Sequence, residues 1–314
     1  MQMKVSQFNI GDYVDGFYII GSVAKRNCVS GEYLTGKIID KSGSINIIAW
    51  QYAGDVTAND NNRIVKVSGL IGGYNGQLQI TADVLRLVTD TDQYDAADIV
   101  PSAPISVDSM MIYIKNVINT LSDADYKSLC KAMLNKYYDK FFSIPAAAFV
   151  HDAVLHGLAH HTFKMLESAE RIADIYADHI DRNLLIAGVI LHDIGKIKEF
   201  ELSETGLVKD YTKEGAAIGH SVLGANLVSE EARALGFSPE KILLITNILY
   251  SHHGKGEYGA AAKPATLEAL LVHLIDEMDA KVTTGIEGSV NTPAGEFSPK
   301  IFGLDNNRIY CHIA

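Results

Sequence analysis

The sequence has few cysteines, no long hydrophobic run and no histidine in its first 150 residues. The three cysteines, Cys28, Cys130 and Cys311, are far apart and odd in number, so we expect packed, reduced thiols rather than a disulfide framework or a zinc knuckle. No stretch reaches the roughly 18 to 20 continuous apolar residues of a membrane span, and the N-terminus lacks the basic-then-apolar layout of a signal peptide. These absences predict a cytoplasmic protein with no membrane partner.

Acidic residues outnumber basic ones, giving a net charge of -11, and the excess lies in one part of the chain. Residues 1–90 contain eight basic and eight acidic side chains, so the whole surplus lies beyond them. An acidic chain argues against tight, non-specific binding of duplexes, which depends on neutralising phosphates. It does not exclude a single strand that is held by base stacking and a bound metal.

Alternating apolar residues predict a small β-barrel in the first part of the chain. Five strands are expected within residues 14–88, separated by turn signals such as Lys41-Ser42-Gly43 and Tyr74-Asn75-Gly76. A long connection between the third and fourth strands, around residues 51–62, favours a five-stranded OB-fold over an immunoglobulin-like sandwich, which usually needs more strands. We assign this barrel to residues 1–90 of a 314-residue chain, which is long enough for two domains.

Helical periodicity replaces the strand pattern beyond a polar, proline-bearing stretch. We assign residues 91–104 to a linker and residues 105–314 to an all-α domain. Helix signals include Asp123 before an amphipathic run, and Pro145, which is expected to open a helix that continues to Tyr176.

Strand alternation divides the residues of the second and third strands between two faces. The interior set is Leu34, Ile38, Ile45, Ile47 and Ala49, and the outer set is Tyr33, Thr35, Lys37, Asn46 and Trp50. The outer aromatic rings can stack bases at about 1 to 3 kcal/mol each, while Lys37, with Arg26 or Lys25, attracts phosphates. The alternative is that these rings pack against the helical domain, and the sequence leaves both interpretations open.

All eleven histidines lie at or beyond His151, and several stand beside acidic residues. His192 and Asp193 end a long apolar helix in LLIAGVILHDIGKIKEF, where Gly195 allows a sharp turn and Lys196 can contact an anion. Imidazole and carboxylate together suit divalent transition metals, and a His-Asp pair inside an apolar run has few structural reasons to exist. This motif therefore predicts a metal site.

Other histidines have a similar placement. His252 and His253 end a second apolar helix just before glycine, and His220 follows Gly219 at the start of a helical pattern. Each is unremarkable alone, but their common placement at helix ends supports the same metal site. We assign ordinary structural or surface roles to His151, His156, His179 and His312.

Two choices stay open on the residues alone. Asp276 and Asp279 are three residues apart on one face of a predicted helix, so we expect one to be a metal ligand and the other to orient a neighbour. His160 and His161 pose a similar choice within GLAHHTFKM.

The ordered motifs resemble a known family. HDIGK, with the ordered histidines and the final aspartate, resembles the HD-domain superfamily of metal phosphohydrolases. The barrel segment YLTGKIIDKSGSINIIAW and the ending TPAGEFSPKIFGLDNNRIYCHI resemble the YhaM-type 3′-to-5′ exoribonucleases, over nearly the whole chain. The resemblance implies His161 and Asp276 as ligands. It places His160 where a carboxylate is expected, which implies a different role or metal preference at that position.

The resemblance implies two divalent ions in a metal-dependent 3′-5′ exonuclease. The expected ligands are His161, His192, Asp193 and Asp276 for one ion, and Asp193, His220, His252 and His253 for the other. Asp193 would bridge the ions, and Lys196 would counter charge on the scissile phosphate, so both are expected to be catalytic. The resemblance favours Mn²⁺, while these ligands alone would also accept Fe, Co, Ni or Zn.

The expected partner is single-stranded RNA, with single-stranded DNA as a second substrate, and the products are nucleoside 5′-monophosphates. The resemblance suggests a homo-oligomer, with a hexamer as one candidate, although no coiled-coil heptad supports a number. Two rival functions remain at this point. The chain could hydrolyse free or cyclic nucleotides with the barrel as a regulatory module, or it could bind single-stranded DNA beside an inactive HD site.

Overall fold

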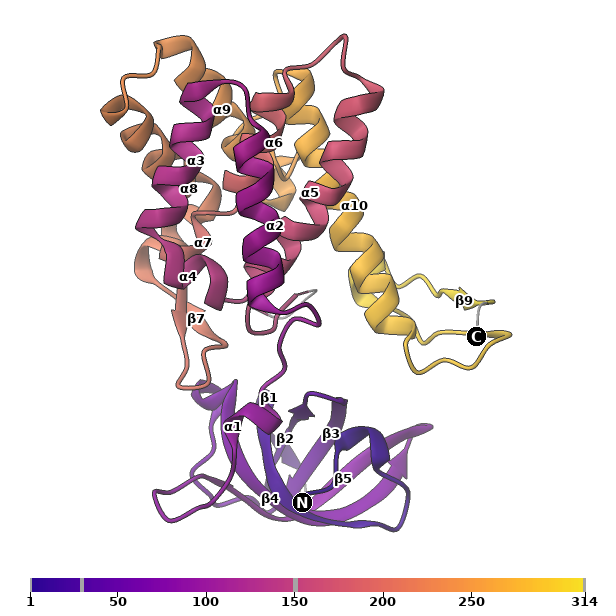
Figure 1. The fold of residues 1–314 in the computed structure, drawn as a ribbon. Helices are drawn as coiled ribbons and strands as arrows, with labels where there is room; N and C mark the ends of the chain where they lie inside the picture. Colours follow the sequence, from indigo (N-terminus) through magenta and orange to yellow (C-terminus); the bar gives the residue numbers. More distant parts are fainter. Residues whose placement is uncertain (1, 29–30, 149–151, 313–314) are drawn as a thin grey trace. The chain divides into compact units, whose positions relative to one another are not determined.

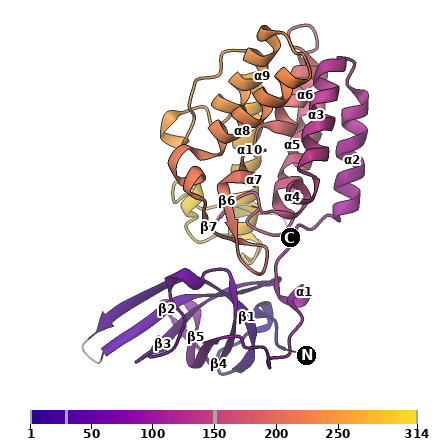
Figure 2. The ribbon, with the colours of Figure 1, turned by 90° about the vertical axis from the view of Figure 1, so that its left-hand side faces the viewer.

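The computed structural model describes residues 2–28, 31–148 and 152–312, and it contains two compact units (Figures 1 and 2). The first unit comprises Met1–Ser102 together with Glu201–Lys209, and the second comprises Ala103–Phe200 together with Asp210–Ala314. The first is built on a β-barrel and the second on a helical bundle. Among the described residues, no helix combines the length and the hydropathy that crossing a bilayer requires.

The first unit is a closed five-stranded barrel, as the sequence predicts. Its strands are β1 (Tyr13–Cys28), β2 (Gly31–Asp40), β3 (Gly43–Trp50), β4 (Arg63–Tyr74) and β5 (Gln77–Leu87). They follow the order β1-β2-β3-β5-β4, and β1 closes the barrel on β4. The β3–β5 pair is parallel, while the other strand pairs are antiparallel. This is the topology of an OB-fold, with the predicted long connection between β3 and β4.

Local sequence explains how the barrel closes. β1 pairs with β4 over Tyr13–Ile20 and with β2 over Ile19–Cys28, and its register shifts between Gly21 and Ala24. Such a bulge bends a strand, so one long strand can belong to both sides of the barrel. The predicted turn at Asn75 and Gly76 has φ of 50° and 76°, which suits the tight hairpin between β4 and β5.

The predicted interior set of the barrel is buried. Leu34, Ile38, Ile45, Ile47 and Ala49 belong to the barrel core and are at most 6% exposed. A short 3-10 helix, η1 (Val5–Gln7), lies at one end of this core, where the Val5 amide donates to Asp40 Oδ2 at 2.9 Å. In the stretch 91–104, helix α1 (Ala96–Ile99) forms and Ile99 is buried. The domain boundaries assigned from the sequence stay predictions.

The second unit is a bundle of helices around one central helix. The longer helices are α2 (Val107–Thr120), α3 (Ala124–Lys136), α5 (Gly157–Ile175), α6 (Arg182–Leu191), α8 (Lys213–Ala234), α9 (Pro239–Ser251) and α10 (Leu267–Ser289), and the short ones are α4 (Tyr138–Ser143) and α7 (Lys196–Glu199). Every residue of α6 from Leu184 to Leu191 is buried. A helix that is apolar on all sides belongs inside a core, so the residues that follow α6 emerge near the middle of the bundle.

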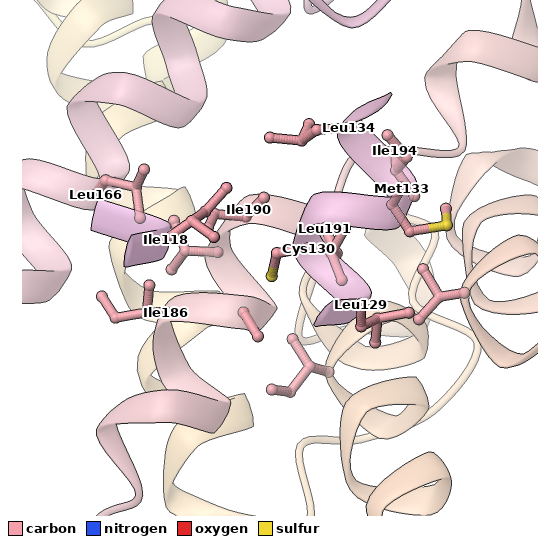
Figure 3. Close-up of a cluster of buried hydrophobic side chains, with 14 of the residues drawn as sticks. Ile118, Leu129, Cys130, Met133, Leu134, Leu166, Ile186, Ile190, Leu191 and Ile194 are labelled. Atoms are coloured by element: carbon pink, nitrogen blue, oxygen red, sulfur yellow. The ribbon is translucent and has the colours of Figure 1, made fainter. Parts of the chain in front are cut away.

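The core around α6 draws on several helices (Figure 3). Leu129, Cys130 and Met133 of α3 pack in the same cluster as Ile190 of α6 and Leu166 of α5. Burial raises the pKa of the Cys130 thiol to about 12, so this side chain serves as a small apolar group. Asp123 caps α3, as its position before the amphipathic run predicts, by accepting from the amides of Asp125 and Tyr126.

The predicted start of one helix is wrong. α5 begins at Gly157 and not at Pro145, because His156 adopts a left-handed conformation with φ of 64°. A side chain at Gly157 would meet the Asp152 carbonyl oxygen at 2.0 Å, so the chain here turns tightly before the helix starts. His151 lies outside the described residues.

The all-α description also omits two short hairpins. They consist of β6 (Phe200–Leu202) with β7 (Val208–Tyr211), and of β8 (Glu296–Phe297) with β9 (Tyr310–Cys311). In the second hairpin region, η4 (Phe302–Leu304) packs beside α10, as the yellow segment of Figure 1 shows.

Candidate metal centre

The end of α6 is held tightly against α8. His192 caps α6, and its Nδ1 lies 2.8 Å from the Val189 carbonyl oxygen. A Cβ atom at Gly195 would lie 2.0 Å from the His220 carbonyl oxygen and 2.6 Å from the Gly224 amide nitrogen. Glycine is therefore required at this contact, and its absence of a side chain brings the His192-Asp193 turn beside His220.

A kink in α8 directs His220 toward the same place. Gly219 has φ of 74° and ψ of 159°, which interrupts the helix just before His220. Glu199 of α7 is 5% exposed, and it accepts a hydrogen bond from the His220 backbone amide at 2.8 Å. Both of its carboxylate oxygens also lie 3.0 Å from His220 Nδ1. The Nε2 atom of His220 is left to face the centre of the bundle.

The end of α9 supplies two more imidazoles. His252 follows the last residue of α9, and its Nδ1 lies 2.8 Å from the Leu249 carbonyl oxygen. His253 Nε2 lies 2.9 Å from His220 Nε2. His273 of α10 contacts the His252 carbonyl oxygen through Nδ1 at 2.8 Å, and it is not part of the group of facing imidazoles.

His161 of α5 lies between two carboxylates of α10. Its Nε2 is 3.2 Å from Asp276 Oδ1, and its Nδ1 is 2.7 Å from Asp279 Oδ2. Lys164 Nζ lies 3.1 Å from the same oxygen of Asp279. One acid thus approaches the ring edge that faces the centre, and the other holds the opposite edge.

Asp193 stands between two groups of donors. Its Oδ2 is 3.3 Å from His192 Nε2 and 3.8 Å from His161 Nε2. Its Oδ1 is 3.4 Å from His220 Nε2 and 3.6 Å from His252 Nε2. We name the two groups the carboxylate half, which consists of His161, His192 and Asp276, and the imidazole half, which consists of His220, His252 and His253. The structure thus brings all seven ligands predicted from the sequence into one centre.

The donor atoms fit a divalent metal. Among the described residues, His192 Nε2 and Asp193 Oδ1 are buried side-chain atoms without a hydrogen-bond partner. Buried polar atoms are rarely left unsatisfied in native proteins, and a metal ion is a common explanation. Because an acceptor faces the Nδ1 atoms of His161, His192, His220 and His252, these rings can each present an Nε2 lone pair to an ion. All five histidines of the two halves and Asp193 also fall into compact sets that suit metal binding.

Electrostatics separates the two halves. Burial lowers the pKa of His253 to about 4, helped by the neighbouring His220, and burial lowers that of His252 well below its usual value. Burial alone would also lower the pKa of His161, but the hydrogen bonds to Asp276 and Asp279 raise it to about 10. His252 and His253 therefore offer neutral nitrogen ligands, while the two acids beside His161 favour a positive charge in the carboxylate half.

Of two further residues considered from the sequence, Lys196 contacts the centre and His160 does not. Lys196 Nζ donates to Asp193 Oδ2 at 2.6 Å, so its ammonium group neutralises the central carboxylate in this structure. Burial alone would raise the pKa of Asp193, but Lys196 and His192 hold it well below its usual value. His160 points to Asp152 instead of the centre, with its Nδ1 2.7 Å from Asp152 Oδ1.

Glu199 and Asp152 were not predicted from the sequence. Both are buried acids that hold a histidine ring, Glu199 that of His220 and Asp152 that of His160. Glu199 lies in the run KIKEF, where charged residues alternate with apolar ones as they do on many protein surfaces. Only its distance of six residues from Asp193 pointed to the site, and that signal is weak.

The predicted outer set of the barrel lies on β2 and β3 of the first unit. Tyr33 pairs with Trp50 across the two strands, their ring centroids are 4.9 Å apart, and Trp50 is 53% exposed. Lys37 pairs with Asn46, and the Thr35 hydroxyl donates to the Ala24 carbonyl oxygen at 3.3 Å. The five residues thus form one outer face with an aromatic end and a polar end.

Fold and centre together define a class of protein. A model of the HD domain matches residues 158–281, which contain the seven facing donors, so the second unit contains the helical HD domain of a metal-dependent phosphohydrolase. Three proteins of Listeria monocytogenes, two from serotype 4b strains and one from strain EGD-e, are each named 3′-5′ exoribonuclease YhaM. Each is 35% identical to this chain over 314 residues, which cover 99% of this chain and 98% of the relative.

The chain belongs to the YhaM family of 3′-5′ exoribonucleases, and it is a metal-dependent hydrolytic nuclease. The family predicted from the sequence is confirmed. Among solved structures, the barrel is similar to the second OB-fold domain of replication protein A from Methanococcus maripaludis, at 16% identity and a TM-score of 0.25, covering 30% of this chain and 100% of that chain.

Proposed function

We propose that this enzyme removes nucleotides one at a time from the 3′ end of single-stranded RNA, and that two divalent ions act together in its centre. The observation that carries the proposal is the position of Asp193, whose two oxygens face separate groups of imidazoles. A carboxylate with donors on both sides is suited to bridge a pair of ions. The proposed ligands are those predicted from the sequence.

The ions would supply a water of lowered pKa and would stabilise the attacking and departing oxygens of an in-line displacement. The reaction adds water to the phosphorus of the terminal phosphodiester and breaks its bond to the 3′ oxygen of the preceding nucleotide. One nucleoside 5′-monophosphate leaves, and the shortened strand regains a 3′ hydroxyl group.

The protein's own side chains hold the donors and the substrate charge. Glu199 and Asp279 keep the rings of His220 and His161 oriented, because each carboxylate faces a ring Nδ1 at 2.7 to 3.0 Å. Lys196 Nζ contacts Asp193 Oδ2 at 2.6 Å. We propose that it also counters charge on the scissile phosphate, since a buried cation next to the reacting group needs no reorganisation.

The outer face of the barrel would hold the strand. Tyr33 and Trp50 offer aromatic rings for stacking, and Arg26 pairs with Tyr33 across β1 and β2, which places a cation beside those rings. Lys37 and Asn46 extend the face in the other direction. Base stacking and a few cations would bind single strands with little preference among bases.

The finer points of this function stay proposals. We favour Mn²⁺, as the family resemblance implies, although the ligands alone would also accept Fe, Co, Ni or Zn. Single-stranded DNA is a second proposed substrate, because discrimination against it needs recognition of the 2′ hydroxyl group. A cytoplasmic location and a homo-oligomer also stay predictions.

The test is incubation of the purified protein with 5′-labelled single-stranded RNA and matched DNA, with Mn²⁺ or with EDTA. A ladder that shrinks from the 3′ end only when metal is present is expected, and Asp193→Ala should abolish it while leaving RNA binding in place. Intact strands with every metal, or normal turnover by Asp193→Ala, would refute the proposal.

A further inference from the structure

A cavity of about 600 Å³ opens from the metal centre within the helical unit. Its inner wall contains donors of both halves of the centre, including His161, His220 and Asp276. Its outer wall contains residues that no metal needs, notably Tyr211 and Tyr258. Enzyme pockets of this size hold small molecules, and a mixed lining of aromatic and polar groups gives them orientation.

The two tyrosines have ring surface to offer. Tyr211 ends β7, touches Phe200 edgewise at a centroid distance of 5.7 Å, and is 43% exposed. Tyr258 lies in η3 (Gly256–Tyr258) and is 60% exposed, with Lys255 Nζ 5.5 Å from its ring centroid. Neither hydroxyl group makes a hydrogen bond to another described residue. Because both side chains are exposed, their rings have surface on which a planar group in the cavity can stack.

The outer wall carries an ion pair and one further carboxylate. Lys281 Nζ pairs with Glu277 Oε1 at 2.7 Å, and both residues line the cavity. Asp305 adds a further carboxylate there, because Gly303 lets the C-terminal segment lie close to Thr284 of α10, where a Cβ atom would be 2.9 Å from Thr284 Cγ2. A wall with paired charges and an extra carboxylate disfavours a second phosphate, and it suits a neutral group that carries hydroxyls.

These features point to one occupant. We propose that the outer part of the cavity is a subsite for the nucleoside of the 3′-terminal nucleotide, with its base stacked on Tyr258 or Tyr211 and its 5′ phosphate at the metal centre. This inference rests on the proposed function and deepens it, because the nucleoside that leaves must lie beyond the scissile phosphate. A strand that continued through the subsite would bring its next phosphate toward Asp305 and Glu277. The subsite thus favours a free 3′ end.

The test combines a change in the protein with a change in the substrate. A trinucleotide RNA is used because all of its nucleotides lie near the scissile phosphate, and it is compared with the same strand in which the 3′-terminal nucleotide lacks its base. For the unmodified protein, loss of that base is expected to lower kcat/KM about fivefold or more, since stacking contributes about 1 to 3 kcal/mol per base. The double variant Tyr211→Ala with Tyr258→Ala is expected to show a similar loss on the complete strand.

The decisive experiment gives the strand without its terminal base to the double alanine variant. Loss of the base and loss of the two rings should not add, because both remove the same stacking contact. The matched double variant Tyr211→Phe with Tyr258→Phe keeps both rings and should recover most of the kcat/KM that the double alanine variant loses, which separates stacking from a folding defect. Tyr176→Ala is the matched control, since Tyr176 is 47% exposed but does not line the cavity. Additive losses, or no loss on removing the base, would overturn the subsite while leaving the exonuclease intact. Failure of the unmodified protein to cleave either strand would overturn both proposals.

Discussion

The two halves of the metal centre are built from different donors around one shared carboxylate. The carboxylate half has Asp276 and, behind it, Asp279, and these acids keep His161 in an environment that favours positive charge. The imidazole half has only histidines at the centre, and burial keeps His252 and His253 neutral. The first half attracts a cation through charge, and the second binds through lone pairs. The two proposed ions should therefore differ in affinity and in metal preference.

The largest effect should come from the residue that both halves share. Asp193→Asn preserves shape but removes the charge between the halves, so both proposed ions lose a ligand. We expect RNA cleavage to fall by about 10⁴-fold, as for removal of a central catalytic group. Metal content measured on the purified protein should fall well below that of the unmodified chain. If it still held two ions per chain, Asp193 would not be the bridge.

Variants in one half alone should each remove one of the two proposed ions. Asp276→Asn should weaken the ion of the carboxylate half, and His253→Ala that of the imidazole half, each leaving one ion per chain. Activity should fall about 10²- to 10³-fold in both, since one ion cannot stabilise both reacting oxygens. His179→Ala is the control, since His179 is exposed and belongs to neither half of the centre. Loss of both ions in either variant would show that the halves bind as one unit.

The acids behind the ligands should have smaller effects. Glu199→Gln in the imidazole half and Asp279→Asn in the carboxylate half keep the shape but weaken the grip on His220 and His161. We expect about 10- to 100-fold weaker metal binding, as is typical for groups that orient a ligand. Competition with a chelator would measure it, and ¹⁵N NMR of the metal-free protein would detect a changed tautomer of His220 in Glu199→Gln. An unchanged tautomer would contradict the positioning role of Glu199.

The ligands could be predicted because they follow local patterns. The apolar run of α6 ends in His192 and Asp193, and α9 ends in His252 and His253, so chain position alone indicates where these side chains emerge. The choice of His161 over His160 could not be made from the sequence spacing of the ligands, because the two histidines are adjacent in the chain. It depends on where α10 lies, which brings Asp276 and Asp279 to one ring and leaves the other with Asp152.

Other features depend on contacts between distant segments. Glu199 is buried where α7 packs on α8 at Gly215, and the break at Gly219 turns His220 toward it. The barrel, by contrast, was predictable in its five strands, its turns and its interior residues, since alternation and turn signals act between neighbours in sequence. The hairpin β6–β7 was missed because strands of three and four residues carry too little pattern to be recognised.

The exposed face of the barrel should affect RNA affinity, whereas the buried metal centre should affect the rate of cleavage. Trp50→Ala should weaken binding of single-stranded RNA by about five- to 100-fold, the contribution of one stacked base. The maximal rate on saturating RNA should change little, since the exposed ring of Trp50 orients no metal ligand. Fluorescence anisotropy with labelled RNA measures the affinity, and Tyr13→Ala, another exposed aromatic of the barrel, is the control. Unchanged affinity would leave the aromatic pair as a packing surface.

The smallest effect should come from an acid that serves structure alone. Asp123 caps α3 and also accepts from Lys241 of α9 at 2.6 Å. Burial alone would raise the pKa of Asp123, but Lys241 and the helix amides lower it below its unfolded value, so its contribution to stability is present above about pH 4 and is lost as pH falls through the lower, folded value. Asp123→Ala should cost about 1 kcal/mol of unfolding free energy at pH 7 and less in acid, measured by urea denaturation. Metal content should not change, because the ion pair of Asp123 with Lys241 joins two helices and is not part of the metal centre.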